Sequence, residues 1–220
     1  MIWLLSCSTT PDTATTPDTG TPTAAVTATL TLLDVASGAP LEGVSVSLDA
    51  ESTTTDSTGS ASLSVPAGQP LTLLADSGDL PHRYHGMAGS EDLSIVGFLA
   101  TRSITSQVYG MLGLSVDEAQ GVVVAAMDLA DLSPAYGASA ALSTGTDGSF
   151  VFGPTLPESG DTLVDGGSSV VFFPNIPPGS ATLTVAPPPG LACTLVDAGT
   201  DTVDVPVVAG EVTVAVFVCR

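Results

Sequence analysis

The chain has 220 residues, of which 44% are hydrophobic but only 5% aromatic, so its apolar content is mostly Val, Leu and Ala. Three arginines, no lysine and 23 acidic residues give a formal net charge of −20, and such a surface repels phosphate backbones. The charge excludes a nucleic-acid-binding protein, and the length leaves room for about two domains.

The first seven residues form an apolar run that ends in a small residue and a cysteine. Leu4, Leu5, Ser6 and Cys7 resemble the lipobox of a bacterial lipoprotein signal peptide, which implies a lipid on Cys7. A lipid with two or more acyl chains would anchor the chain durably in a membrane. Residues 1–7 are too short for a complete signal peptide, so we expect the true start to lie upstream.

Residues 8–25 are rich in Thr and Pro and contain an approximate repeat, without any periodic apolar positions. Such a segment cannot bury a core. We therefore expect an extended, disordered tether that holds the rest of the chain away from the membrane.

Apolar and polar residues alternate at residues 26–32, 44–48 and 60–65, and this period of two predicts half-buried strands. A further strand is predicted at residues 71–74. Turns that contain Gly and Asp separate these segments. Short strands at this spacing are typical of a sandwich, so we expect a first β-sandwich module at residues 26–102.

Residues 33–75 carry a recurring order of turn and strand residues. The positions concerned are Gly38, Pro40, Leu41, Gly43, Val44, Thr55, Asp56, Gly59, Val65, Pro66 and Gly68. With this pattern the segment resembles a carboxypeptidase regulatory-like domain, of the transthyretin-like β-sandwich type. The resemblance implies a structural or adhesive accessory module and brings no catalytic residues.

A short helix is predicted over residues 103–114, in a link at residues 103–120. Its apolar residues Ile104, Val108, Met111 and Leu112 are spaced for one helix face, and Ser103 is the expected N-cap.

Strand-like segments resume at residue 121 and end with the alternating residues 212–218. Residues 176–179 echo residues 65–68, which favours duplication of one fold over residues 121–220. We therefore predict an all-β fold of two tandem antiparallel β-sandwich modules, transthyretin-like or immunoglobulin-like, with one short linking helix.

Cys193 and Cys219 form an even pair in the second module once Cys7 carries lipid. In an oxidising compartment such a pair predicts a disulfide. A thiol nucleophile or a metal site lacks support here, because the second module contains no histidine.

Both histidines of the chain, His82 and His85, lie beside Tyr84 in residues 81–85. Two histidines and a tyrosine on a β-sandwich resemble the iron site of intradiol dioxygenases, but those sites carry His-x-His and two tyrosines. We therefore predict no metal and no cofactor, and keep His82 and His85 as the metal candidates. The expected structure is a mobile polar loop with Tyr84 packed on the sandwich and the histidines facing solvent.

Carboxylates offer two further metal hypotheses. Glu91 or Asp92 could complete a zinc site with the histidines, although a structural zinc needs four ligands at defined spacing. Asp56, Asp147 and Asp165 lie in turns that contain Gly and suggest calcium, but none belongs to an EF-hand loop. We expect turn chemistry to account for these aspartates.

The leading hypothesis is a non-enzymatic lipoprotein of the bacterial cell envelope, exposed at the outer membrane or cell surface, that serves as a structural or adhesive module. The alternative is a binding module for polysaccharide or another envelope ligand, although the scarcity of aromatics argues against sugar stacking. A third hypothesis, a metal-dependent oxygenase or hydrolase, rests on His82 and His85 alone. Expected partners are the membrane, through Cys7, and an envelope component or another surface protein, and we expect a monomer.

Overall fold

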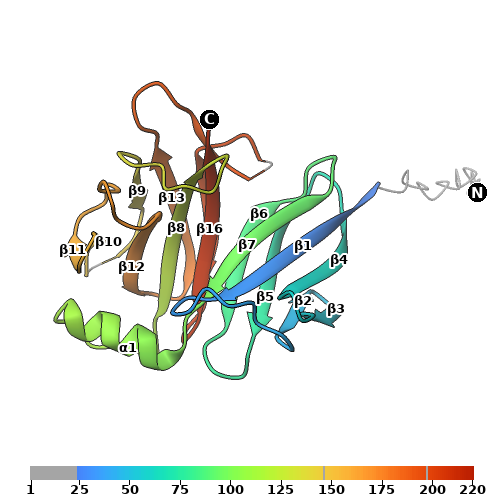
Figure 1. Ribbon diagram of the computed structural model, residues 1–220, viewed down its shortest axis with the longest axis horizontal. Helices are drawn as coiled ribbons and strands as arrows, with labels where there is room; N and C mark the ends of the chain where they lie inside the picture. Colours follow the sequence, from blue (N-terminus) through green and yellow to red (C-terminus); the bar gives the residue numbers. More distant parts are fainter. Residues whose placement is uncertain (1–23, 146, 197) are drawn as a thin grey trace, which may run out of the picture.

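The computed structural model describes residues 24–145, 147–196 and 198–220. Cys7 and residues 8–23 of the expected tether lie outside the described residues. Within the described residues the chain forms β-strands and one helix (Figure 1), which confirms the all-β fold class.

The strands expected at residues 26–32, 44–48, 60–65 and 71–74 are all present. The first half of the chain contains β1 (Ala25–Asp34), β2 (Ser45–Leu48), β3 (Glu51–Thr54), β4 (Ser60–Pro66), β5 (Pro70–Asp76), β6 (His82–Met87) and β7 (Leu93–Leu99). The helix and the second half follow as α1 (Arg102–Met111), β8 (Gly121–Leu129), β9 (Ser139–Leu142), β10 (Phe150–Phe152), β11 (Pro157–Ser159), β12 (Val170–Ile176), β13 (Gly179–Ala186), β14 (Cys193–Leu195), β15 (Thr202–Val207) and β16 (Val212–Cys219).

The strands form a large central sheet and two small outer sheets. The central sheet has the order β11-β10-β12-β8-β16-β6-β5-β2-β3, with β14 paired to the end of β16. The first outer sheet is β4-β1-β7, and the second outer sheet is β15-β13-β9. Side chains alternate between the two faces of a strand, so Val122 and Val212 join the core under the first outer sheet, whereas Val123 and Ala215 join the other core. The outer sheets therefore cover opposite faces of the central sheet, each over a different half.

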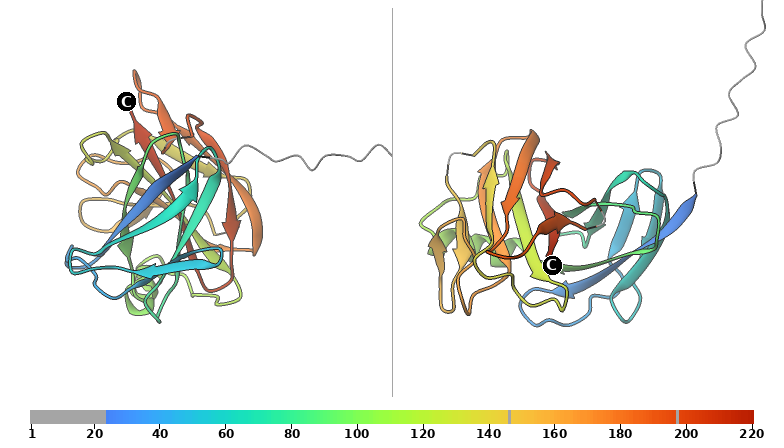
Figure 2. Two further views of the ribbon diagram at one scale, coloured as in Figure 1. Left: turned by 90° about the vertical axis from the view of Figure 1, so that its right-hand side faces the viewer. Right: turned by 90° about the horizontal axis from the view of Figure 1, so that it is seen from above.

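Strand β16 connects the two halves of the molecule. It pairs in parallel with β8 over residues 212–219 and with β6 over residues 212–215. Figure 2 shows β16, in dark red, between the two halves when the molecule is seen from above. The central sheet is thus continuous across residues 26–102 and 121–220, and the limits of the two modules stay predictions.

The central sheet and the first outer sheet are mixed, which corrects the expectation of wholly antiparallel sandwiches, whereas the second outer sheet is antiparallel throughout. Besides the two parallel ladders of β16, β1 pairs in parallel with β7. Parallel partners need long crossovers instead of hairpins, and the alternation within a single strand does not show which partner it will find.

Helix α1 begins at Arg102, and its N-cap is Thr101 instead of the expected Ser103. The Thr101 hydroxyl accepts a hydrogen bond from the backbone N–H of Ile104 at 3.2 Å. The first N–H groups of a helix have no acceptor within the helix, and the Thr101 side chain supplies one for Ile104.

One face of α1 packs on the central sheet. The buried Tyr109 ring meets Phe172 of β12 edge to face, with centroids 5.7 Å apart, while Met111, expected on this face, is exposed. The Tyr109 hydroxyl accepts a hydrogen bond from the backbone N–H of Asn175 at 3.2 Å. The side-chain amide of Asn175 donates a hydrogen bond to the carboxylate of Asp147 at 2.7 Å. Asp147 therefore takes part in the network that holds α1 in place.

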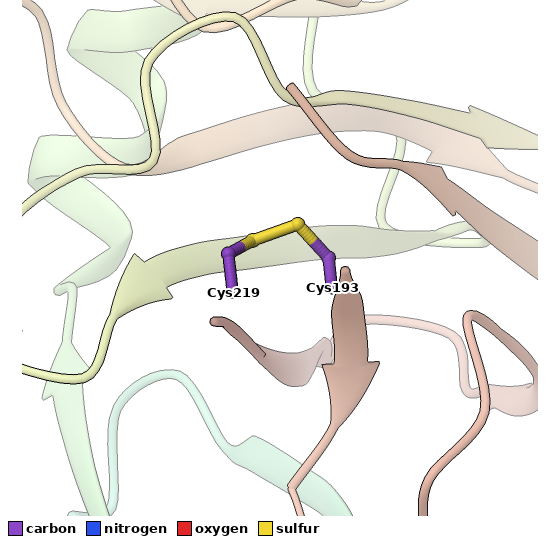
Figure 3. The surroundings of a disulfide bond; sticks show 2 residues. All are labelled: Cys193 and Cys219. Carbon is purple, nitrogen blue, oxygen red and sulfur yellow. A yellow bond between two sulfur atoms is a disulfide. The ribbon is translucent and has the colours of Figure 1, made fainter. Parts of the chain in front are cut away.

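The expected disulfide between Cys193 and Cys219 is present (Figure 3). The two residues are register partners in the antiparallel ladder of β14 and β16. The bond therefore fixes the end of the strand that connects the two halves.

Replacing both cysteines by serine should lower the free energy of unfolding by roughly 3 kcal/mol, because the cross-link restricts the unfolded chain. Urea unfolding of the oxidised wild type and the double variant measures this difference. Reduced wild type is the control and should unfold like the variant. Equal unfolding midpoints for the oxidised and reduced wild type would contradict the stabilising role.

Candidate functional site

The segment with both histidines is a central strand, so the expected mobile loop is wrong. Strand β6 lies between β5 and β16, with His82 and Tyr84 on one face and His85 on the other. All three side chains are buried, with exposed fractions of 2%, 0% and 8%, so the histidines do not face solvent. The flanking Gly and Pro residues suggested a loop, but pairing with a strand from the end of the chain determines the structure.

Local hydrogen bonds hold each imidazole. His82 Nε2 accepts from the backbone N–H of Ala100 at 3.3 Å, so its Nδ1 donates to the carbonyl oxygen of Leu80 at 2.9 Å. His85 Nδ1 lies 2.9 Å from the hydroxyl of Thr72. Burial lowers the pKa of His82 to about 4, although its bond to Leu80 acts in the opposite direction, and burial also lowers the pKa of His85.

The two histidines cannot bind the same metal ion, because their rings lie on opposite faces of β6. Among the described residues, no group of three His, Cys, Asp or Glu side chains is arranged to hold a metal ion. The absence of a metal and of a cofactor stays a prediction. In the same part of the chain, no helix has the length and apolar character needed to span a membrane.

Asp56 and Asp165, two of the aspartates that suggested a calcium site, differ from each other in their surroundings. Asp56 accepts hydrogen bonds from the N–H groups of Thr58 and Ser60, at 2.8 and 3.0 Å, and from the Thr58 hydroxyl. These hydrogen bonds lower the pKa of Asp56, and the bond from the Thr58 hydroxyl has the largest effect. Asp165 is exposed in its turn. The contacts of Asp56 are those of a turn-stabilising carboxylate.

Tyr84 reaches across the first core to β7. Its hydroxyl donates to the carbonyl oxygen of Phe98 at 2.8 Å, and burial raises its pKa. Its ring lies directly over Gly97, where an added Cβ would overlap the ring atoms. Tyr84 is therefore a packing residue that requires glycine on the opposing strand.

Gly97→Ala should destabilise the fold by about 2 kcal/mol, because the added methyl group overlaps the Tyr84 ring. In a Tyr84→Ala background the same change should cost much less, since the ring is gone. Urea unfolding of the two single variants and the double variant forms the cycle. Strictly additive losses would show that the two residues do not interact as described.

An apolar groove of about 450 Å³ opens between the two halves. Its floor is the part of the central sheet that the first outer sheet leaves uncovered, and it includes Val214 of β16 and Phe172 of β12. One wall is β7, with Val96 and Phe98, and the other includes Val108 of α1. Phe98 is 51% exposed at this rim.

Asp128 is the carboxylate among the residues that line the groove. It follows Val124 and Ala126 on the same face of β8. Burial raises the pKa of Asp128 to about 6, and a hydrogen bond with Ser169 offsets part of this rise. The described residues of the lining include no Arg or Lys, so no neighbouring cation compensates this carboxylate.

Sequence reasoning missed Asp128 and the groove. The available signal was the row Val122, Val124, Ala126 and Asp128, in which a carboxylate ends an apolar face. Its exposure on the floor of a groove depends on where the first outer sheet stops, and this cannot be read from β8 alone.

Asp128→Asn should stabilise the protein at neutral pH. A carboxyl group whose pKa is raised from 3.8 to about 6 contributes most to stability below about pH 4 and loses that contribution as the pH rises to about 6. Allowing for solvent screening of a partly exposed group, we expect a gain of roughly 1 kcal/mol for the variant at neutral pH.

Urea unfolding of wild type and Asp128→Asn across this pH range measures the effect, with the exposed Asp165→Asn as control. The curves for Asp128→Asn and wild type should converge near pH 4. A difference that is independent of pH would contradict the raised pKa.

No protein-family model matches the sequence, and no curated protein matches it. Among solved structures, the chain is similar to the TIE protein of Bacillus anthracis, with 13% identity, a TM-score of 0.29 and coverage of 89% of this chain and 34% of that chain. The minor pilin GBS52 of Streptococcus agalactiae has 12% identity and a TM-score of 0.31, covering 88% of this chain and 94% of the pilin. The shaft pilin SpaA of Lactobacillus rhamnosus GG has 10% identity and a TM-score of 0.26, covering 89% and 97%. The chain thus spans about a third of the Bacillus protein, and likeness of this degree establishes neither a family nor a function.

Proposed function

We propose that the chain is a non-enzymatic lipoprotein of the bacterial envelope. A lipid on Cys7 anchors it, the residues between Cys7 and the start of the described body form the tether, and the β-sheet body is a structural or adhesive module displayed at the cell surface. The tether was expected to run to residue 25, but Ala25 already belongs to β1 and pairs with Pro66 of β4. The observation that carries the proposal is the two-sided pairing of β16, which makes the body one continuous unit suited to act as a rigid spacer.

The position of β1 fits a tethered module. Figure 1 shows β1, in blue, starting at one end of the body, while α1 and the second half lie at the other end. β1 pairs with β4 on one edge and with β7 on the other, so the tether is continuous with a strand held on both sides. An anchor at this end would present the groove and the second half away from the membrane.

The charge of the chain supports the same arrangement. A net charge of −20 repels the anionic head groups of a bacterial membrane and keeps the body from settling on the surface. Two of the three arginines form ion pairs within the body, Arg83 with Glu211 and Arg102 with Asp79.

The third hypothesis, a metal-dependent enzyme, has no geometric support, because His82 and His85 lie on opposite faces of β6. The alternative of a ligand-binding module keeps support from the apolar groove. Pockets of this volume with apolar walls and few polar groups are typical of ligand sites.

The chain, expressed in a bacterial host behind a complete signal peptide, should incorporate labelled palmitate and remain in the membrane fraction. The matched variant Cys7→Ser should be unlabelled and soluble, because it lacks the thiol that receives the lipid. If the wild type is also soluble and unlabelled, the lipoprotein proposal is wrong.

A further inference from the structure

Two parallel strands, β8 and β16, supply a row of apolar side chains each to the floor of the groove, which is called the channel below. Val124, Ala126 and Asp128 lie two residues apart on one face of β8, a row of about 13 Å at the rise of an extended strand. Val214 and Val216 run beside them on the parallel strand β16. The floor therefore offers an extended apolar row that ends in the carboxylate of Asp128, which suits a linear ligand.

Six of the residues that line the groove carry polar side chains, namely His82, Tyr84, Thr105, Gln107, Asp128 and Ser169, and the rest of the lining is apolar or glycine. His82 is saturated by its bonds to Leu80 and Ala100, and the Tyr84 hydroxyl already donates to Phe98. A polysaccharide, which carries a hydroxyl on almost every carbon, would leave most of its polar groups unpaired on such a floor. The walls instead suit an alkyl chain.

The charge of the site selects the head group of the ligand. The Asp128 carboxyl group is ionised at neutral pH, because its pKa of about 6 lies below neutral pH. The described lining supplies no cation, and Arg83 and Arg102 are paired elsewhere. An anionic amphiphile would be repelled, whereas an ammonium group would form the ion pair that Asp128 lacks.

We infer that the groove binds a linear amphiphile with a cationic head group, with its alkyl chain along β8 and β16 and its ammonium group at Asp128. The inference extends beyond the proposed function, because the groove would bind such a ligand whether or not Cys7 carries lipid. It assigns Val124, Ala126 and Val214 to the alkyl chain and Asp128 to the head group.

Isothermal titration calorimetry with decylammonium, decanol and decanoate tests this assignment, because the probes share one chain and differ in head-group charge. The protein is the full chain with Cys7→Ser, which removes attached lipid from the measurement. Decylammonium should bind more tightly than decanol, and decanoate should bind least. Asp128→Asn should weaken decylammonium binding by about tenfold or more and leave decanol unchanged.

Two controls make the result specific. Asp165→Asn makes the same change of charge on the surface outside the groove and should leave all three affinities unchanged. Ala126→Phe fills the floor of the channel and should abolish binding of all three probes, while an unfolding curve like that of the wild type shows that the variant is folded.

Two outcomes would overturn the inference. Equal binding of all three probes, insensitive to Asp128→Asn, would show a nonspecific apolar surface. Preference for an uncharged extended peptide of alternating Val and Thr over decylammonium would assign the groove to a polypeptide strand paired with the open edge of β7.

Discussion

The structure depends on the pairing of its last strand with partners from both halves of the chain. β16 forms parallel ladders with β8 and β6, so the second half satisfies its backbone groups along one edge, and the first half satisfies those of residues 212–215 along the other. The end of that second edge pairs with β14. The side chains on its two faces enter different cores, with Val214 in one and Phe217 in the other. The ion pair between Arg83 and Glu211 and the disulfide at Cys219 hold the two ends of this strand.

A shared central sheet with staggered outer sheets accounts for the remaining features. The first outer sheet stops at β7, so the adjoining face of β8 and β12 is covered only in part by α1, and the groove with Asp128 remains. In the first half, the first outer sheet buries Tyr84 against Gly97, and Ala100, directly after β7, donates a hydrogen bond to His82. Tyr84 and His82, which suggested chemistry in the sequence, are thus packed and hydrogen-bonded in the core, and the partly buried carboxylate of the groove, Asp128, is a residue that the sequence did not single out.

Local patterns in the sequence predicted the all-β fold, the strands with strict alternation and the disulfide, because these depend on side-chain period and on two cysteines in one half. They failed at β6, whose Pro and Gly neighbours look like a loop and whose burial comes from β16 at the other end of the chain. The same long-range pairing decides which strands are parallel and where the floor of the groove is exposed. The N-cap was misplaced by two residues because Thr101 and Ser103 are chemically equivalent caps, and only the backbone conformation distinguishes them.

The central claim is that the parallel ladders of β16 make the two halves one cooperative unit. Native-state hydrogen exchange in rising urea tests it most directly, by following the amides of β5 and β6 in the first half and of β8 and β12 in the second. The account predicts that both sets exchange only through one global unfolding event with the same free energy. Exchange of one half through its own opening, while the other half stays protected, would contradict it.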